Sequence, residues 1–239
     1  MKDDKKLILK CLVGSRAHGL HTLESDFDYR GVYVEPTQKI LSLGYKYKGS
    51  GWFEGKEDQT MYEIGHFLHL ALKCNPSILE VFMAPRVRRR NELYGEELRR
   101  NFDFGSDLCR LFPYIWNPKN AFDAFVGYGL NQRKKMLDKK DSRPRKYAVA
   151  YLRTLWNLYD LLVTGKFNLK VTDPDFRKEL EEIKYSTGPL DLGYVINRAE
   201  SLTAHAEGVL PLCQHKAEPE KVNQFLLKIR KEYWLCRKY

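Results

Sequence analysis

Two acidic residues near the N-terminus are placed to support metal-assisted phosphate chemistry. Asp26 and Asp28 stand two positions apart, so in an extended strand their side chains project from the same face. Gly14 and Ser15 precede them, at the end of an apolar segment, residues 7–13, that predicts a buried strand. Small residues let the backbone approach a ligand and leave N–H groups to hold phosphate oxygens. Paired carboxylates facing such a turn suit magnesium ions that bridge a nucleoside triphosphate.

A second strand is predicted to carry the acids. Alternation along it would place Arg30 on the face of Asp26 and Asp28, and would direct Phe27 and Tyr29 into the core. An arginine on that face would offset phosphate charge. Arg16, just after the Gly-Ser turn, flanks the acids from the other side, although an exposed surface position fits this residue equally well.

The order of these motifs resembles a known family. Residues 14–19 read Gly-Ser-x-x-x-Gly, and residues 25–31 read Ser-Asp-x-Asp-x-Arg-Gly. Together they are similar to the signature of the DNA polymerase beta superfamily of nucleotidyltransferases, in the form found in its RNA-repair-associated branch. Residues 73–80 are likewise similar to that family's Lys-x-Asn-Pro-x-x-x-Glu segment.

The resemblance implies a set of site residues and a cofactor. It implies Mg²⁺, or Mn²⁺ in its place, held by Asp26, Asp28 and a third carboxylate that also helps the acceptor hydroxyl lose its proton. The residues implied to bind the nucleotide are Gly14, Ser15, Arg16, Gly19, Arg30, Lys146 and Arg153.

The third carboxylate has more than one candidate. Asp58 lies in a strand-like segment, residues 57–62, that would neighbour the acids. Glu63 stands where an amphipathic helix, residues 63–73, begins, and an acid in a first helical turn has an ordinary explanation. We therefore favour Asp58 as catalytic residue and metal ligand, with Glu63 second and Glu57 third.

The remainder of the chain predicts an α+β protein. The N-terminal part mixes strand and helix patterns, with a loop or hairpin at residues 45–55. Later segments with helical patterns are 94–103, 119–138, 144–164, 174–184, 191–208 and 218–232. We predict a nucleotidyltransferase fold, a mixed β-sheet flanked by helices, at residues 1–105 and an α-helical domain at residues 106–239.

One predicted helix carries the last two implied nucleotide contacts. Lys146 and Arg153 are seven residues apart, two helical turns, and so project from the same side. The family usually has a histidine where this chain has Ala150, and an Ile-Arg pair where it has Ile183-Lys184. Four aromatic residues at helical spacing on this helix favour core positions over base stacking: Tyr147, Tyr151, Trp156 and Tyr159.

Composition points to a polyanionic partner. The 239 residues carry a formal net charge of +10, which favours RNA, DNA or nucleotides, with a merely solvated basic face as the alternative. The residues expected to form part of an RNA track are Arg86, Arg88, Arg89, Arg90, Lys134, Lys135, Lys139 and Lys140. Five scattered cysteines without a Cys-x-x-Cys pair, and the lack of a signal peptide or membrane span, predict a cytoplasmic protein that acts away from membranes.

The expected reaction is transfer of a nucleoside monophosphate from an NTP to an acceptor hydroxyl. The favoured acceptor is an RNA end, a tRNA or a broken RNA 3′ end. Two alternatives remain open at this point: nucleotidylation of a protein or small molecule, and a catalytically idle module that binds nucleotide or RNA. Sequence alone leaves the preferred NTP and the oligomeric state open.

Overall fold

The computed structural model describes residues 5–46, 50–53, 58–87, 104–138, 140 and 143–234. The chain is divided between two compact units. The first comprises residues 1–72, 80–115 and 217–239, and the second comprises residues 73–79 and 116–216. The fold is α+β, with a mixed sheet near the N-terminus and a helical region after it, as predicted.

The first unit is built on a four-stranded sheet in the order β1-β2-β4-β3. β1 (Lys6–Val13) pairs antiparallel with β2 (Asp28–Val34), and β2 pairs parallel with β4 (Asp58–Glu63). β3 (Ser50–Phe53) pairs antiparallel with β4, so part of the predicted loop or hairpin at residues 45–55 is a strand of the sheet. The parallel pair brings the start of β2 beside the start of β4, because Asp28 and Asp58 are register partners.

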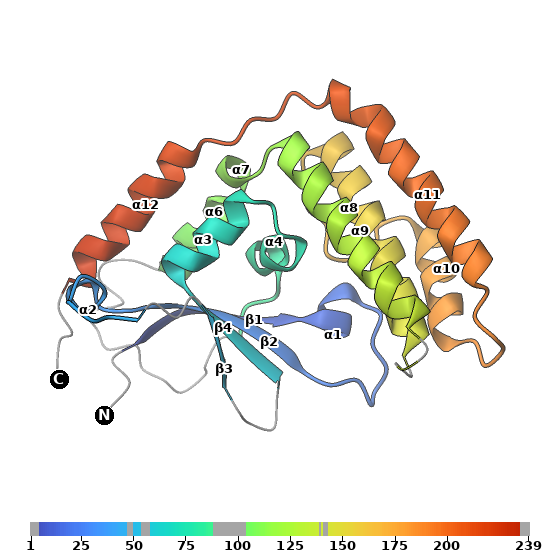
Figure 1. The fold of residues 1–239 in the computed structure, drawn as a ribbon, viewed down its shortest axis with the longest axis horizontal. Coiled ribbons are helices and arrows are strands. Elements are labelled where there is room, and N and C mark those ends of the chain that lie inside the picture. Colours follow the sequence, from blue (N-terminus) through green and yellow to red (C-terminus); the bar gives the residue numbers. More distant parts are fainter. Residues whose placement is uncertain are drawn as a thin grey trace. The chain divides into compact units, whose positions relative to one another are not determined.

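Helices of the first unit gather over one face of this sheet (Figure 1). Its core includes Val32 from β2, and Ile64 and Phe67 from the helix after β4, each fully buried. The Phe67 ring lies 5.2 Å from the Phe82 ring, centroid to centroid. The described helices of this unit are α1 (Gly14–His18), α2 (Thr37–Ile40), α3 (Ile64–Leu72), α6 (Phe104–Arg110), α7 (Phe112–Ile115), α12 (Pro219–Glu232) and the end of α4 (Pro76–Met83).

The C-terminal helix belongs to the first unit. α12 packs on α3 and α7, and it buries Val222, Phe225 and Ile229. The domain boundary between residues 105 and 106 remains a prediction. The compact units follow another division, in which residues 80–115 and 217–239 belong with the N-terminal sheet. α12 belongs to the first unit because its apolar face is buried there. The spacing of apolar residues predicts that a helix has such a face, but it does not predict which unit will bury it.

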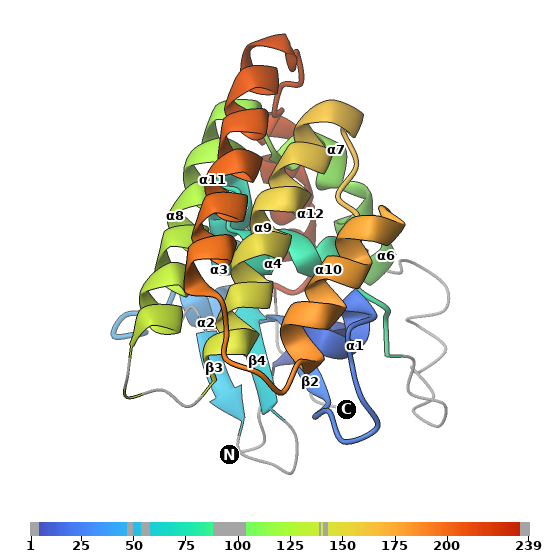
Figure 2. The same cartoon turned by 90° about the vertical axis from the view of Figure 1, so that its right-hand side faces the viewer.

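The second unit is a group of helices around α9 (Pro144–Thr164), with α8, α10 and α11 packed against it (Figure 2). The described bounds are α8 (Pro118–Leu137), α10 (Pro174–Tyr185) and α11 (Leu192–Val209), followed by a short 3-10 helix at Leu210–Leu212. Gly165 ends α9 with φ +70°, the left-handed conformation that glycine adopts without a steric penalty.

The helix predictions from residue 119 onward agree with these bounds to within about two residues, whereas the predicted helix at residues 94–103 lies outside the described residues. Tyr147, Tyr151 and Trp156 are buried, as expected for core positions, and Tyr159 is half-buried. Across the described part of the chain, no helix combines the length and apolar character that crossing a bilayer requires.

Candidate active site

The Gly14–Ser15 turn and the Asp28 carboxylate are in direct steric contact. Gly14 follows β1 immediately, and Val13 at the end of β1 is the register partner of Asp28. Gly14 has φ +70°, and a Cβ built on it would lie 2.2 Å from Asp28 Oδ2. Both the backbone conformation and the lack of space therefore require glycine here. Among the described residues, the hydroxyl of Ser15 has no hydrogen-bond partner.

Asp26 lies in the loop before β2, where strand alternation does not apply. β2 begins at Asp28, and Asp26 is exposed. The prediction that Phe27 and Tyr29 point into the core was wrong, because Phe27 is 45% exposed and stacks on Tyr29 at 6.4 Å between centroids. The buried part of β2 is its second half, residues 31–34.

Arg16 holds the loop that carries Asp26. Its guanidinium donates to the carbonyl oxygen of Ser25 at 2.7 Å and to that of Asp26 at 3.3 Å. It also lies 3.8 Å from the centroid of the Phe27 ring, a cation–π contact. Gly19 ends α1 with φ 72° and turns the chain into the same loop. These contacts place Arg16 and Gly19 in the support of the acidic loop.

A buried carboxylate that spacing did not single out connects the turn to β2. Glu80, on α4, is only 6% exposed. It accepts hydrogen bonds from Gly14 N at 3.3 Å and from Arg30 at 3.0 Å, and its Oε1 lies 2.7 Å from His18 Nε2. One carboxylate thus touches the Gly-Ser turn, α1 and the acid-bearing strand. Its sequence signal was its place at the end of the Lys-x-Asn-Pro-x-x-x-Glu segment.

The two main candidates for the third carboxylate occupy opposite ends of β4. Asp58 is the register partner of Asp28, so its backbone is adjacent to the acidic strand; its side chain lies outside the described residues, as does Glu57. Glu63 pairs in register with Tyr33, five residues further along the sheet. Its fully buried carboxylate accepts a hydrogen bond from Gly65 N at 2.7 Å and forms an ion pair with Arg230 of α12 at 2.7 Å. Glu63 therefore joins α12 to the sheet.

The remaining predicted contacts belong to both units, and some of them lie outside the described residues. Lys146 is exposed on α9 and Arg153 is half-buried there. Burial, together with the charge of Lys146, lowers the pKa of Lys184 at the end of α10, so these two cations lie near each other. Arg86 donates to the Ser106 hydroxyl at 2.6 Å. Of the expected RNA track, Lys134, Lys135 and Lys140 are exposed, and Arg88, Arg89, Arg90 and Lys139 lie outside the described residues.

A thiol next to this site is unsuited to nucleophilic chemistry. Cys11, the register partner of Arg30, is fully buried, and burial raises the pKa of its thiol to about 12. The thiolate is the nucleophilic form, so this side chain stays protonated and inert at neutral pH.

Glu80 is predicted to be a positioning residue for the turn. We expect Glu80→Gln to lower stability by about 3 kcal/mol, since it removes the charge that compensates Arg30 inside the protein. If Asp28 holds a divalent cation, we also expect the metal concentration for half-maximal activity to rise, because Glu80 fixes the Gly14 amide beside that carboxylate. Chemical denaturation and a metal titration measure the two effects.

Glu181→Gln supplies the matched control for Glu80. Glu181 pairs with Arg177 at 3.0 Å on the surface of α10, where such a pair contributes at most about 0.5 kcal/mol. An unchanged metal titration in a folded Glu80→Gln protein would show that Glu80 serves the fold alone.

Comparisons with known proteins point to one family. The family model described as RNA repair pathway DNA polymerase beta family (RlaP) matches residues 1–169, which include every described strand. A crystal structure of a nucleotidyltransferase-like protein from Exiguobacterium sibiricum 255-15 aligns with a TM-score of 0.30 and 11% identity, over 95% of this chain and 74% of that chain. No curated protein matches.

Proposed function

The chain belongs to the RNA repair pathway DNA polymerase beta family, and we propose that it transfers a nucleoside monophosphate from an NTP to a hydroxyl at an RNA end. In this reaction the acceptor oxygen forms a bond to the α-phosphorus, and the bond from that phosphorus to the bridging oxygen breaks. The electron pair leaves with pyrophosphate, and the acceptor loses its proton. Charge grows on the phosphate oxygens, so the site must supply cations and positioning.

The observation that carries this proposal is the close approach of Gly14 to Asp28. A turn with a left-handed glycine and an open hydroxyl at Ser15 stands against a carboxylate, with no side chain between them. Phosphate oxygens need hydrogen-bond donors, and divalent cations need carboxylate oxygens, so a triphosphate with its cation satisfies both sides. Asp26 and the start of β4 lie next to Asp28 along the loop and the sheet.

A divalent cation fits the residues present. Gly14 lets the backbone of the turn lie directly against the Asp28 carboxylate, and the loop that carries Asp26 is tied to α1 by Arg16. Asp26 and Asp28, with Asp58, would hold Mg²⁺, or Mn²⁺ in its place; within the described side chains no three ligating groups already form a cluster. When bound, such an ion supplies positive charge for the developing negative charge on the phosphate oxygens.

The neighbouring residues receive roles that follow from their contacts. Ser15 would donate its hydroxyl to a terminal phosphate oxygen, and Arg30, held by Glu80, would offset phosphate charge from β2. Asp58 would take the proton of the acceptor hydroxyl. The family resemblance, and no contact, assigns Lys146 and Arg153 of α9 to nucleotide binding as well. Ser15 and Arg30 would thus position the phosphates, whereas Asp58 would carry out the proton transfer.

Charge supports RNA as the acceptor. The net charge of +10 favours a polyanion, and the family description concerns RNA repair. We expect the triple variant Lys134→Ser, Lys135→Ser, Lys140→Ser to weaken RNA binding uniformly across sequences, and to flatten the logarithmic salt dependence by roughly one for each phosphate contact removed. Affinity of the Gly14–Asp28 site for free NTP should stay unchanged. Filter binding at several salt concentrations provides the measurement.

Control substitutions should separate track residues from general charge. Lys119→Ser and Lys178→Ser remove exposed lysines that already pair with carboxylates four residues away, at 2.8 Å and 3.8 Å. If the track variant and the control variant show the same salt slope as the parent, the basic residues are a solvated face, and a protein or small molecule becomes the better acceptor.

Transfer of label from each NTP tests the proposed function directly. The full chain is incubated with Mg²⁺ and α-³²P-labelled ATP, CTP, GTP or UTP, together with RNA, bulk protein or small hydroxylic acceptors. Label should enter RNA, should fail to enter when the metal is chelated, and should be released by ribonuclease. Label in protein or in a small product would identify the other acceptors, and NTP binding without turnover would indicate an idle module.

A further inference from the structure

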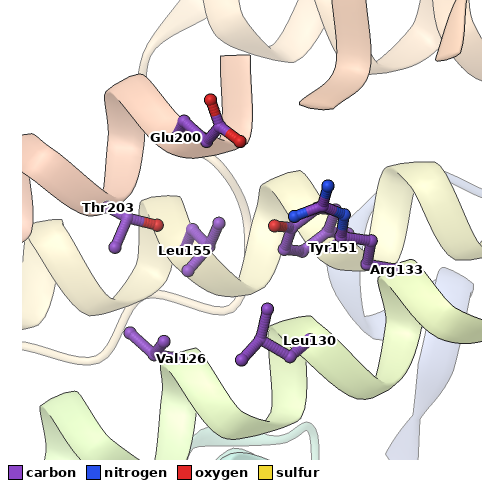
Figure 3. Close-up of a pocket in the computed structure, with 7 residues that line it drawn as sticks. All are labelled: Val126, Leu130, Arg133, Tyr151, Leu155, Glu200 and Thr203. Atoms are coloured by element: carbon purple, nitrogen blue, oxygen red, sulfur yellow. The ribbon is translucent and has the colours of Figure 1, made fainter. Parts of the chain in front are cut away.

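The helical unit contains a pocket that the proposed reaction does not use. α8, α9 and α11 line a pocket of about 200 Å³ that opens to solvent (Figure 3). Its lining includes the apolar side chains of Val126, Leu130 and Leu155 and the polar side chains of Arg133, Tyr151 and Glu200. Leu130 is 51% exposed, so it presents apolar surface to water at the rim.

Tyr151 and Arg133 form a fixed pair of donors. Tyr151 is only 4% exposed, and its ring fits against Gly129, where an added Cβ would lie 3.0 Å from the ring. Burial raises the pKa of the Tyr151 hydroxyl above its usual value, although the hydrogen-bonded Arg133 guanidinium opposes this, so the phenol keeps its proton. Because Arg133 donates to the phenol oxygen, the phenol O–H remains available to an acceptor in the pocket.

The carboxylate of Glu200 is a hydrogen-bond acceptor in the same pocket, and it forms no ion pair with Arg133. It projects from α11, and Figure 3 shows its carboxylate apart from the Arg133–Tyr151 pair. Within the described part of the chain, Glu200 forms no hydrogen bond or ion pair. A cation and an anion thus face one small space, each able to bind a complementary group. A planar aromatic ligand with hydrogen-bond acceptors next to hydrogen-bond donors could bind Arg133 and Glu200 at the same time. Its ring would also cover the exposed side chain of Leu130.

We propose that this pocket binds a nucleobase with the hydrogen-bonding edge of guanine, either in a free guanine nucleotide or in an RNA strand. The O6 and N7 acceptors of guanine suit Arg133 and the Tyr151 hydroxyl, and arginine to these two atoms is the commonest specific contact to guanine. The adjacent N1–H and N2–H donors suit Glu200. Adenine carries an amino donor in place of O6, which would face the donors of Arg133 and leave them unpaired.

An exposed cation lies one helical turn beyond the pocket-lining residue Leu130. Lys134 is exposed and lies four residues after Leu130, so it continues the pocket-lining face of α8 by one turn. This lysine would attract the phosphate of a nucleotide bound in the pocket. The inference concerns binding alone and requires no transfer reaction.

The test is photocrosslinking of the full chain with 8-azidoguanosine monophosphate, and with a short oligoribonucleotide that carries one 8-azidoguanosine, both in EDTA. We expect crosslinked peptides from α8, α9 or α11, and competition by GMP at a concentration roughly tenfold below that of AMP. IMP, which lacks the N2 amino group, should compete less well than GMP. Crosslinking by the mononucleotide assigns a free ligand, and crosslinking by the oligoribonucleotide alone assigns an RNA base.

Two variants decide the role of the pocket residues. Glu200→Gln should reduce crosslinking roughly tenfold and make GMP and IMP equal competitors, whereas Glu207→Gln, an exposed residue two turns along α11, should change nothing. Equal competition by GMP and AMP, or full crosslinking in Glu200→Gln, would overturn the proposal. Asp28→Asn should retain the crosslink, so loss of the transfer reaction and loss of this site give different results.

Discussion

Asp28→Asn is expected to abolish transfer of label from NTP to the acceptor while leaving the protein folded. The substitution preserves shape but removes the negative charge that stands against the Gly14–Ser15 turn. A neutral amide is a poor ligand for Mg²⁺, and the transition state then lacks compensation for its growing negative charge. We expect a loss of at least 10²–10³-fold in kcat, the range seen when one stabilising group is removed. Asp26→Asn should act in the same direction.

The same variant needs a folding control, because Asp28 also begins β2. Circular dichroism and the thermal midpoint should match the parent, since Asp28 is half-buried at the end of a strand. Asp123→Asn, which affects an exposed ion pair with Lys119, should keep full activity. A folded Asp28→Asn protein that loses no more than a few-fold in kcat would contradict the assignment of Asp28.

Helices and the chemical motif could be predicted because their signals are local. The apolar stripes of α8 and α9 and the prolines at their first positions mark the helices within the segments themselves. The Gly-Ser turn and the paired acids likewise lie within 20 residues of one another. Family resemblance then supplied the order of these motifs, and the matching family model confirms that resemblance.

The error at Phe27 shows where local reasoning ends. Side-chain alternation does not extend back to Asp26, since the strand begins at Asp28 and Arg16 donates to the carbonyl groups of the preceding loop. An arginine that satisfies backbone acceptors can hold a loop extended without a strand partner. The Phe27 ring therefore packs against the Arg16 guanidinium and does not enter the core.

Partners far apart in the sequence were beyond prediction. Glu80 reaches Gly14 across 66 positions, and Arg230 reaches Glu63 across 167, through packing that no periodicity encodes. A buried carboxylate needs a compensating donor or cation, so its presence predicts that a partner exists without identifying it. The sequence interpretation could therefore rank Asp58 above Glu63 but could not foresee that Glu63 binds α12.

Asp58→Asn and Glu63→Gln should separate catalysis from stability. We expect Asp58→Asn to reduce kcat by roughly 10²–10⁴-fold with little change in NTP affinity, the usual effect of losing a general base. Its thermal midpoint should stay close to that of the parent. Glu63→Gln should instead destabilise the protein by about 3–5 kcal/mol, because it leaves the Arg230 guanidinium buried without its counter-charge. Single-turnover transfer, NTP binding and denaturant unfolding measure the three quantities.

A double-mutant cycle makes the second half of this prediction specific. Arg230→Met should also destabilise the fold, but Glu63→Gln combined with Arg230→Met should cost clearly less than the sum of the two, since the pair is removed together. Activity measured well below each midpoint should remain near that of the parent in all three proteins. If Glu63→Gln instead abolishes transfer at an unchanged midpoint, Glu63 is the third carboxylate, and Asp58 loses that role.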